Sequence, residues 1–325
     1  MTGPAGERYV VRRPAAAGGC PGVQGGDATR RTFLSDAQVP GCGHYLDMTW
    51  VHPDSHPGRY ATARVLENDQ YLLHVSMDWA KPQDLGATVE FHLAGQPITF
   101  STTTAVFIPA GTPYGPLSWK DFRRPHVQLC LVFGSGEAPV GRAAGPAVGL
   151  PAAAGPAAGG PMAAWAAQDA GTDYERYVIR SPLREAGPNQ VDGRQNPTMT
   201  YLSRTQIPGV DAYNEFGWIW DVPAPSIPKM RHDDFDEIVV HIGSDPDHPE
   251  DLGGMLQFGV GDDQVELDTT HCAYLPRGVD HGPLVWTEVR RPLIEMAVML
   301  GAGTLAEGWD NSFFDLPDGG RRGPK

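Results

Sequence analysis

Short apolar runs separated by turn signals mark the second half of the chain. Residues 238–242 read Ile-Val-Val-His-Ile, residues 255–260 form a second run that ends at Gly-Asp-Asp, and residues 293–300 form another. Turn residues recur about every 8–15 positions, and no long stretch has the 3.6-residue period of an amphipathic helix. This pattern predicts an all-β protein built as a sandwich, a barrel or a jelly roll.

The chain also contains an internal duplication. Residues 7–12 (Glu-Arg-Tyr-Val-Val-Arg) return as residues 175–180 (Glu-Arg-Tyr-Val-Ile-Arg), and residues 71–134 align without a gap with residues 238–301. The aligned stretch holds 19 identical residues in 64 positions, all at an offset of 167. Such a series of matches at one spacing indicates a repeat. We therefore expect two copies of one β-rich domain.

A change in composition separates the two copies. Ala, Gly and Pro occupy 23 of the 30 positions from 141 to 170, which leaves almost nothing to bury. We expect a loosely packed or disordered linker there. The predicted organisation is an N-terminal domain at 1–140, this linker at 141–170 and a C-terminal domain at 171–325.

The composition argues against several classes of partner. A net charge of −14 disfavours binding to nucleic acid or to an anionic membrane. The sequence contains no run of 18 apolar residues, so no membrane span is expected. The first 19 residues lack the apolar core of a secretory signal. Four scattered cysteines form no CxxC pair. Together these features lead us to expect a cytoplasmic protein with reduced thiols.

Two short motifs in the second copy carry candidate chemistry. Residues 232–237 read His-Asp-Asp-Phe-Asp-Glu, and residues 276–281 read Pro-Arg-Gly-Val-Asp-His. The pair resembles the signature of the cupins, in which His-x-His-x4-Glu is followed by Pro-x-Gly-x-x-His. The resemblance covers both copies and implies two tandem double-stranded β-helix (jelly-roll) barrels, that is, a bicupin. It also implies that His232, Glu237 and His281 are metal ligands.

The residue types at these positions suit a metal ion. Two imidazoles and one carboxylate offer three ligands to one divalent metal and leave further positions open, a pattern typical of non-haem Fe(II) oxygenases. Fe(II) is therefore favoured, and Zn, Mn, Ni and Co remain open. Met230 stands where the family has its first histidine, and a thioether is a weak ligand for Fe(II) or Zn(II).

Two further residues are predicted to be catalytic. His241 shares a strand face with Glu237 and should point into the barrel, where a role as a ligand, as an acid or base, or in packing stays open. Glu295 interrupts an apolar strand, and a buried carboxylate is costly unless it is paired. Arg290 or Arg291 is its expected partner.

The first copy lacks the ligand set. Val65, Gln70 and Tyr114 replace His232, Glu237 and His281, so we expect a degenerate barrel kept for packing. An independent metal site that uses His44, His52 and His56 is a weaker alternative, because the segment is interrupted by proline and lies outside the motif.

The leading hypothesis is a metal-dependent cupin enzyme that acts on a small organic molecule, most directly a non-haem Fe(II) oxygenase of secondary metabolism. A redox-neutral cyclase, isomerase or decarboxylase is the first alternative, and a non-catalytic small-molecule-binding bicupin is the second. The expected partner is the small-molecule substrate, with neither nucleic acid nor membrane, and assembly as a homodimer is left open.

Overall fold

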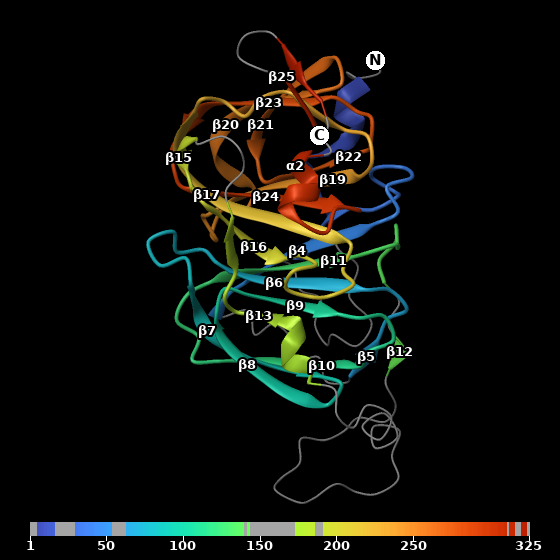
Figure 1. The fold of residues 1–325 in the computed structure, drawn as a ribbon. Helices are drawn as coiled ribbons and strands as arrows, with labels where there is room; N and C mark the ends of the chain where they lie inside the picture. The colour runs from blue at the N-terminus through green and yellow to red at the C-terminus, as the bar shows by residue number, and fades with distance from the viewer. Residues whose placement is uncertain are drawn as a thin grey trace, which may run out of the picture. The chain divides into compact units, whose positions relative to one another are not determined.

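The computed structural model describes residues 5–16, 30–53, 63–139, 142–143, 173–185, 191–310, 312–315 and 320–323. Its contacts divide the chain into two compact units, and both are built from antiparallel strands (Figure 1). We call the unit with residues 1–14, 37–42 and 181–325 the C-terminal barrel, and the unit with residues 15–36 and 43–180 the N-terminal barrel. The prediction of an all-β protein is confirmed.

The C-terminal barrel consists of two sheets. One sheet has the order β1-β22-β19-β24-β17-β16-β14, with β15 beside β17, and the other has the order β21-β20-β23-β18-β25-β26. Its strands are β1 (Val10–Val11), β14 (Leu183–Glu185), β15 (Asp192–Arg194), β16 (Thr198–Leu202), β17 (Ala212–Ala224), β18 (Met230–His232), β19 (Asp236–Gly243), β20 (Asp251–Val260), β21 (Asp263–Thr269), β22 (His271–Leu275), β23 (His281–Val289), β24 (Leu293–Leu300), β25 (Ser312–Asp315) and β26 (Arg321–Arg322).

The N-terminal barrel repeats this plan. One sheet has the order β13-β9-β6-β11-β4-β3-β2 and the other the order β12-β5-β10-β7-β8. Its strands are β2 (Ala15–Ala16), β3 (Arg30–Leu34), β4 (Tyr45–Val51), β5 (Arg64–Val65), β6 (Gln70–Ser76), β7 (Asp84–Leu93), β8 (Gln96–Thr102), β9 (Thr104–Ile108), β10 (Tyr114–Lys120), β11 (His126–Val132), β12 (Arg142–Ala143) and β13 (Val178–Ile179).

The duplication extends to the burial of single side chains. β7 and β20 are the same ten repeat positions and share one sequence of buried and partly exposed residues, and β8 and β21 match in the same way. The alternation follows from the pleat, which turns every second side chain towards the core. In the C-terminal barrel these inward side chains, among them Leu256, Phe258 and Val265, belong to one buried apolar cluster.

The two arms that carry the repeated motif at 7–12 and 175–180 are exchanged. The first arm, with the 3-10 helix η1 (Ala5–Tyr9), adds β1 to β22 of the C-terminal barrel. The second, with the 3-10 helix η3 (Tyr174–Tyr177), adds β13 to β9 of the N-terminal barrel. By their contacts, residues 1–14 belong to the C-terminal barrel and residues 173–180 to the N-terminal barrel. The units therefore differ from the domains expected at 1–140 and 171–325. The expected linker at 141–170 lies outside the described residues, except for 142–143.

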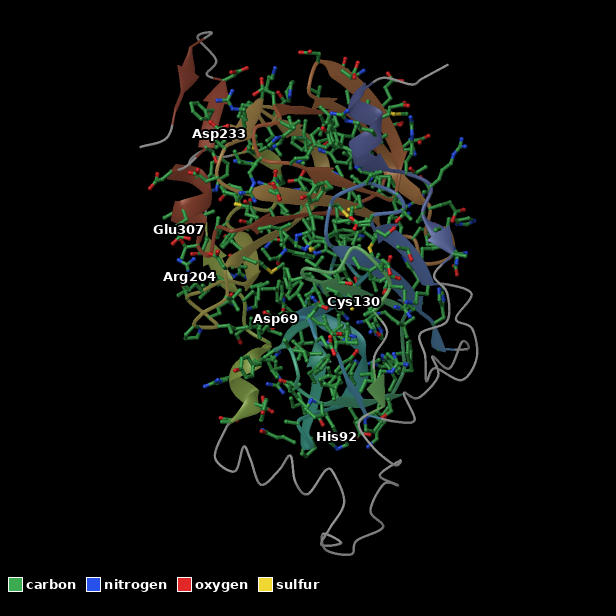
Figure 2. All side chains as sticks on the ribbon, turned by 90° about the vertical axis from the view of Figure 1, so that its right-hand side faces the viewer. Asp69, His92, Cys130, Arg204, Asp233 and Glu307 are labelled. Carbon is green, nitrogen blue, oxygen red and sulfur yellow. The ribbon has the colours of Figure 1, made fainter. Side chains whose placement is uncertain are left out.

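The helix α2 (Leu305–Asp310) follows β24 and leads into β25. Glu307 on this helix pairs with Arg204, which also contacts Asp211; Figure 2 shows Arg204 and Glu307 side by side. Glu307 also accepts a hydrogen bond from the backbone of Gly303 at 2.7 Å. These contacts fix α2 against the barrel. No helix in the described ranges is long and apolar enough to cross a membrane.

Deleting residues 1–14 should loosen the C-terminal barrel. The deletion removes β1 and the hydrogen bond from Gly6 N to Asp263 Oδ2 at 2.7 Å, so it leaves β22 as an unpaired sheet edge. Backbone amides of β22 should then exchange faster with deuterium, while those of β9 keep their protection. The matched control is Ile179→Pro in β13. This variant should speed the exchange of the β9 amides and leave the β22 amides protected. Faster exchange in β9 after the deletion would contradict the exchanged arms.

Two buried histidines of the N-terminal barrel should make it sensitive to acid. Burial lowers the pKa of His74 to about 3 and lowers that of His126 well below its usual range. Their unfolded-state pKa is about 6.5. The unfolded chain therefore binds more protons, so stability is complete above about pH 6.5 and falls as the pH drops towards 3.

Each of these histidines should contribute a slope of about 1.4 kcal/mol per pH unit within that window. Urea denaturation from about pH 7.5 to about pH 5 measures the slope for wild type and for His74→Asn. The slope of the variant should be smaller by about 1.4 kcal/mol per pH unit, because one fewer proton is taken up on unfolding. His248→Asn, a change at an exposed histidine, is the control. An unaltered slope in the His74 variant would count against the assignment.

Candidate metal centre

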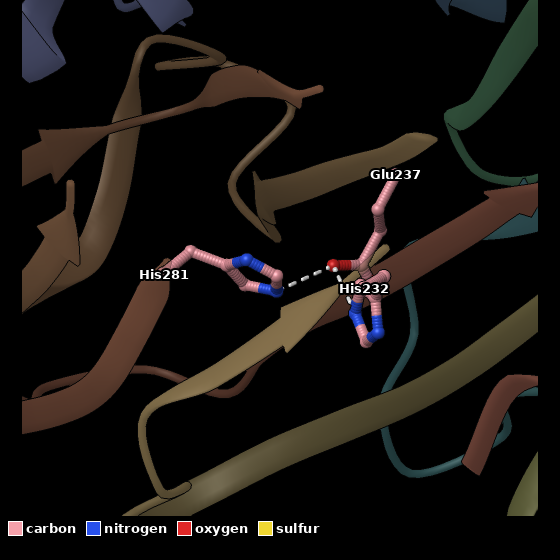
Figure 3. Close-up of side chains that lie close together, drawn as sticks. All are labelled: His232, Glu237 and His281. Atoms are coloured by element: carbon pink, nitrogen blue, oxygen red, sulfur yellow. Dashed lines mark ion pairs between the residues drawn. The ribbon is translucent and has the colours of Figure 1, made fainter. Parts of the chain in front are cut away.

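Three strands of the C-terminal barrel bring the predicted ligands together. His232 ends β18, Glu237 is the second residue of β19, and His281 begins β23. All three side chains are buried, with 2–4% of their surface exposed. One ligand atom from each lies within 4.8 Å of the other two, and Figure 3 shows both imidazoles turned towards the Glu237 carboxylate.

The turn of the second motif joins the three strands. The backbone N–H of Gly278 donates to the carbonyl oxygen of His232 at 2.6 Å, and Gly278 has φ +79, which favours glycine. The carboxylate of Asp236 accepts from the backbone of Arg277 at 2.8 Å and from Tyr274 Oη at 2.9 Å. The start of β19 is therefore tied to the turn that precedes His281.

Each histidine has a defined tautomer. Ser312 Oγ donates to the carbonyl of Gly308 and lies 2.6 Å from His232 Nδ1, so it accepts the proton on that nitrogen. His281 Nδ1 lies 3.1 Å from the carbonyl oxygen of Val279, which can only accept. Both rings therefore carry a proton on Nδ1. Neither Nε2 makes a hydrogen bond within the described part of the chain, so each neutral ring turns an Nε2 lone pair towards Glu237.

Three electron-pair donors thus face one another. His281 Nε2 lies 3.0 Å and His232 Nε2 lies 3.4 Å from Glu237 Oε2. Neither contact has hydrogen-bond geometry, and among the described residues none of these three buried atoms has a hydrogen-bond partner. The donor set fits a divalent cation.

The three residues line one cavity of about 90 Å³. Trp309 stacks on Phe314 at 4.8 Å, and both side chains line this cavity. Met230, which stands at the first histidine position of the motif, also lines it. The remaining apolar wall consists of Val191, Ile227, Val239, Leu284, Ala297 and Met299.

The two predicted catalytic residues lie at and behind the cavity wall. Glu295 lines the cavity together with Arg194 and Glu215. His241 is fully buried, and its Nε2 lies 3.2 Å from Glu295 Oε2. Its other nitrogen, Nδ1, lies 2.9 Å from Nε2 of His271. The structure thus connects His241 to the cavity through Glu295 and places it outside the His-Glu-His cluster.

The prediction that Arg290 or Arg291 pairs with Glu295 is wrong. Arg194 Nε lies 2.7 Å from Glu295 Oε1; the Glu295 side chain is buried and that of Arg194 is partly buried. Arg290 and Arg291 instead pair with Asp251, because the turn after β23 carries them to the start of β20. Arg194 comes from β15, a short strand with no apolar pattern, so sequence spacing gave no signal for it.

The N-terminal barrel has no comparable centre within its described ranges. Val65 lies in β5, Gln70 in β6 and Tyr114 in β10, at the repeat positions of the three ligands. His56, which the alternative site requires, lies outside the described residues.

Ser312 was also not anticipated. Ser312 lies 80 residues after His232 in the sequence, at the start of β25, and no motif surrounds it. Only the pairing of β25 with β18 places it opposite His232.

Neither a family model nor a curated protein matches the sequence. Among solved structures, the 7S globulin of Momordica charantia is similar over 91% of this chain and 84% of its own, with a TM-score of 0.52 and 10% identity. The coconut allergen cocosin is similar over 84% of this chain and 81% of its own, with a TM-score of 0.51 and 11% identity. Both are cupin-fold proteins, and at such identities the likeness shows the fold alone. The chain therefore has the bicupin fold, with two tandem jelly-roll barrels of which the C-terminal one carries the His-Glu-His cluster.

Proposed function

We propose that the C-terminal barrel binds one divalent metal ion through His232, Glu237 and His281 and is the active centre of a metal-dependent enzyme for a small organic molecule. The observation that carries this proposal is the convergence of three buried ligand atoms, none of which has a hydrogen-bond partner among the described residues. A cation is the group that removes the repulsion among such atoms. Fe(II) is the favoured ion, and Zn, Mn, Ni and Co suit the same ligands.

The protein's own residues have distinct tasks in this proposal. Ser312 and the carbonyl of Val279 hold the two Nδ1 protons, so that both Nε2 lone pairs stay available. Phe235 stacks on the His232 ring at 4.4 Å and fixes its plane. The apolar wall excludes water from the substrate. When bound, the metal supplies Lewis acidity towards substrate oxygens and, as iron, redox chemistry.

Two reaction classes follow from different parts of the cavity. The ligand set of two histidines and one carboxylate favours an Fe(II) oxygenase. Glu295, a charged group that can accept or give a proton, lines the same cavity and favours a redox-neutral isomerisation or decarboxylation of a carbonyl compound. Met230 leaves an open position for substrate in either case, because its thioether is a weak ligand for these ions.

The full chain, stripped with a chelator and titrated with Co²⁺, should bind about one metal ion. His281→Ala should lower its affinity by more than the roughly 100-fold that loss of an outer partner costs. His248→Ala, which removes an exposed histidine of the same barrel, is the control. Metal analysis and calorimetry measure both. Equal binding by the His281 variant and wild type would remove the proposed site.

Ser312→Ala should weaken metal binding without removing a ligand. The variant leaves the Nδ1 proton of His232 without its acceptor, so the ring can turn or change tautomer. We expect a loss of affinity of roughly 10- to 100-fold, measured by competition with a coloured chelator. Ser244→Ala, which removes a hydroxyl that bonds to Pro292 O elsewhere in the barrel, is the matched control. Wild-type affinity in the Ser312 variant would show that the hydrogen bond does not orient a ligand.

A further inference from the structure

His241 lies in the middle of a buried chain of polar groups behind the cavity. Its Nδ1 is 2.9 Å from His271 Nε2, and its Nε2 is 3.2 Å from Glu295 Oε2. His271 begins β22 and Glu295 is in β24, the two strands that flank His241 on β19. Trp286 of β23 packs edge-on against the ring at 5.3 Å and adds no charge.

The proton of His271 settles one side of this chain. His271 Nδ1 lies 2.7 Å from the carbonyl oxygen of Thr269, so it must donate. Burial lowers the pKa of His271 to about 3, so the ring holds only that proton. Its Nε2 is therefore an acceptor, and the hydrogen bond to His241 exists only if His241 Nδ1 carries a proton.

The charge of Glu295 settles the other side. Arg194 Nε lies 2.7 Å from Glu295 Oε1, and Arg194 Nη2 also donates to Glu215 Oε1 at 2.9 Å. Burial raises the pKa of Glu295, but the charge of Arg194 and the contact with His241 hold it below its usual value. Glu295 is thus a carboxylate that accepts, so His241 Nε2 must also carry a proton.

These two hydrogen-bond partners require a proton on each nitrogen of His241, which would make the ring an imidazolium. The buried row then alternates in sign, from His241 through Glu295 and Arg194 to Glu215, and its net charge is zero. Alternation of this kind is what allows charges to stay buried, because each one has a partner of opposite sign.

The N-terminal barrel holds a natural comparison. His74 occupies the repeat position of His241, and it lies opposite Thr104 and Gln128 where His241 lies opposite His271 and Glu295. Neither neighbour of His74 is charged, and burial lowers the pKa of His74 to about 3, so this ring is neutral.

We propose that His241 and Glu295 form a proton store for the cavity. The proton on His241 Nε2 passes to Glu295 Oε2, and Glu295 passes it to the bound substrate. His241 is left neutral, with its Nδ1 proton still donated to His271. In an isomerisation, the proton that the substrate loses goes back to the His241–Glu295 pair. In a decarboxylation, the pair takes up a new proton from water after the reaction. The inference rests on the proposed function and assigns it a carbonyl substrate that gains a proton; His241 acts through Glu295 as a positioning residue.

Nitrogen NMR of the full chain with ¹⁵N-labelled histidine tests the charge directly. At about pH 8, His241 should show protons on both ring nitrogens, while His74 and His271 should each show one. Signals are assigned by their loss in His241→Gln and His74→Gln. Glu295→Gln should leave His241 with a single proton, whereas Glu288→Gln, a change at an exposed carboxylate, should not. A singly protonated His241 in wild type overturns the proposal.

Two additions separate a proton store from a fixed ion pair and from the metal proposal. In a store, the Nε2 proton of His241 exchanges with solvent through Glu295 faster than the Nδ1 proton. Equal and slow exchange of both protons would mean a purely structural ion pair and would overturn the inference. Zn²⁺ added to the same sample should shift the signals of His232 and His281 but leave His241 doubly protonated. Unmoved signals of those two rings would count against the metal centre alone.

Discussion

The hydrogen bonds that hold the Nδ1 protons of His232 and His281 determine which atoms face the cavity of the C-terminal barrel. Because Ser312 and the carbonyl of Val279 take the Nδ1 protons of His232 and His281, the Nε2 lone pairs meet the Glu237 carboxylate with nothing positive between them. Such an arrangement is unfavourable unless a cation joins it. The surrounding strands, the turn at Gly278 and the α2–β25 segment all serve to keep these three groups in place.

The duplicated barrels place one buried histidine of the repeat in two different polar surroundings. His74 and His241 occupy the same register position in the same fold, and both are buried. Two neighbours differ: Thr104 and Gln128 around the first histidine correspond to His271 and Glu295 around the second. These two differences, together with Arg194 from another strand, place His241 in a chain of polar contacts where His74 has Thr104 and Gln128 as its strand neighbours.

The fold and the clustering of His232, Glu237 and His281 could be predicted from the sequence because their signals are local. Strand alternation, turn residues and the two histidine motifs each lie within a few residues of one another, and the repeat makes them visible twice. The partners of these residues come from distant segments that have no pattern of their own. Arg194 has no sequence signal for this reason, whereas Arg290 and Arg291 are near Glu295 in sequence but pair with Asp251. The arm exchange was equally hidden, since residues 7–12 and 175–180 are nearly identical and suit either barrel edge.

The central claim is most directly tested by anomalous diffraction from crystals of the full chain grown with Co²⁺. The account predicts one strong anomalous peak in the C-terminal barrel, bonded to Nε2 of His232, Nε2 of His281 and a carboxylate oxygen of Glu237. Metal at full occupancy elsewhere, with these three side chains hydrogen-bonded to one another or to water, would contradict it.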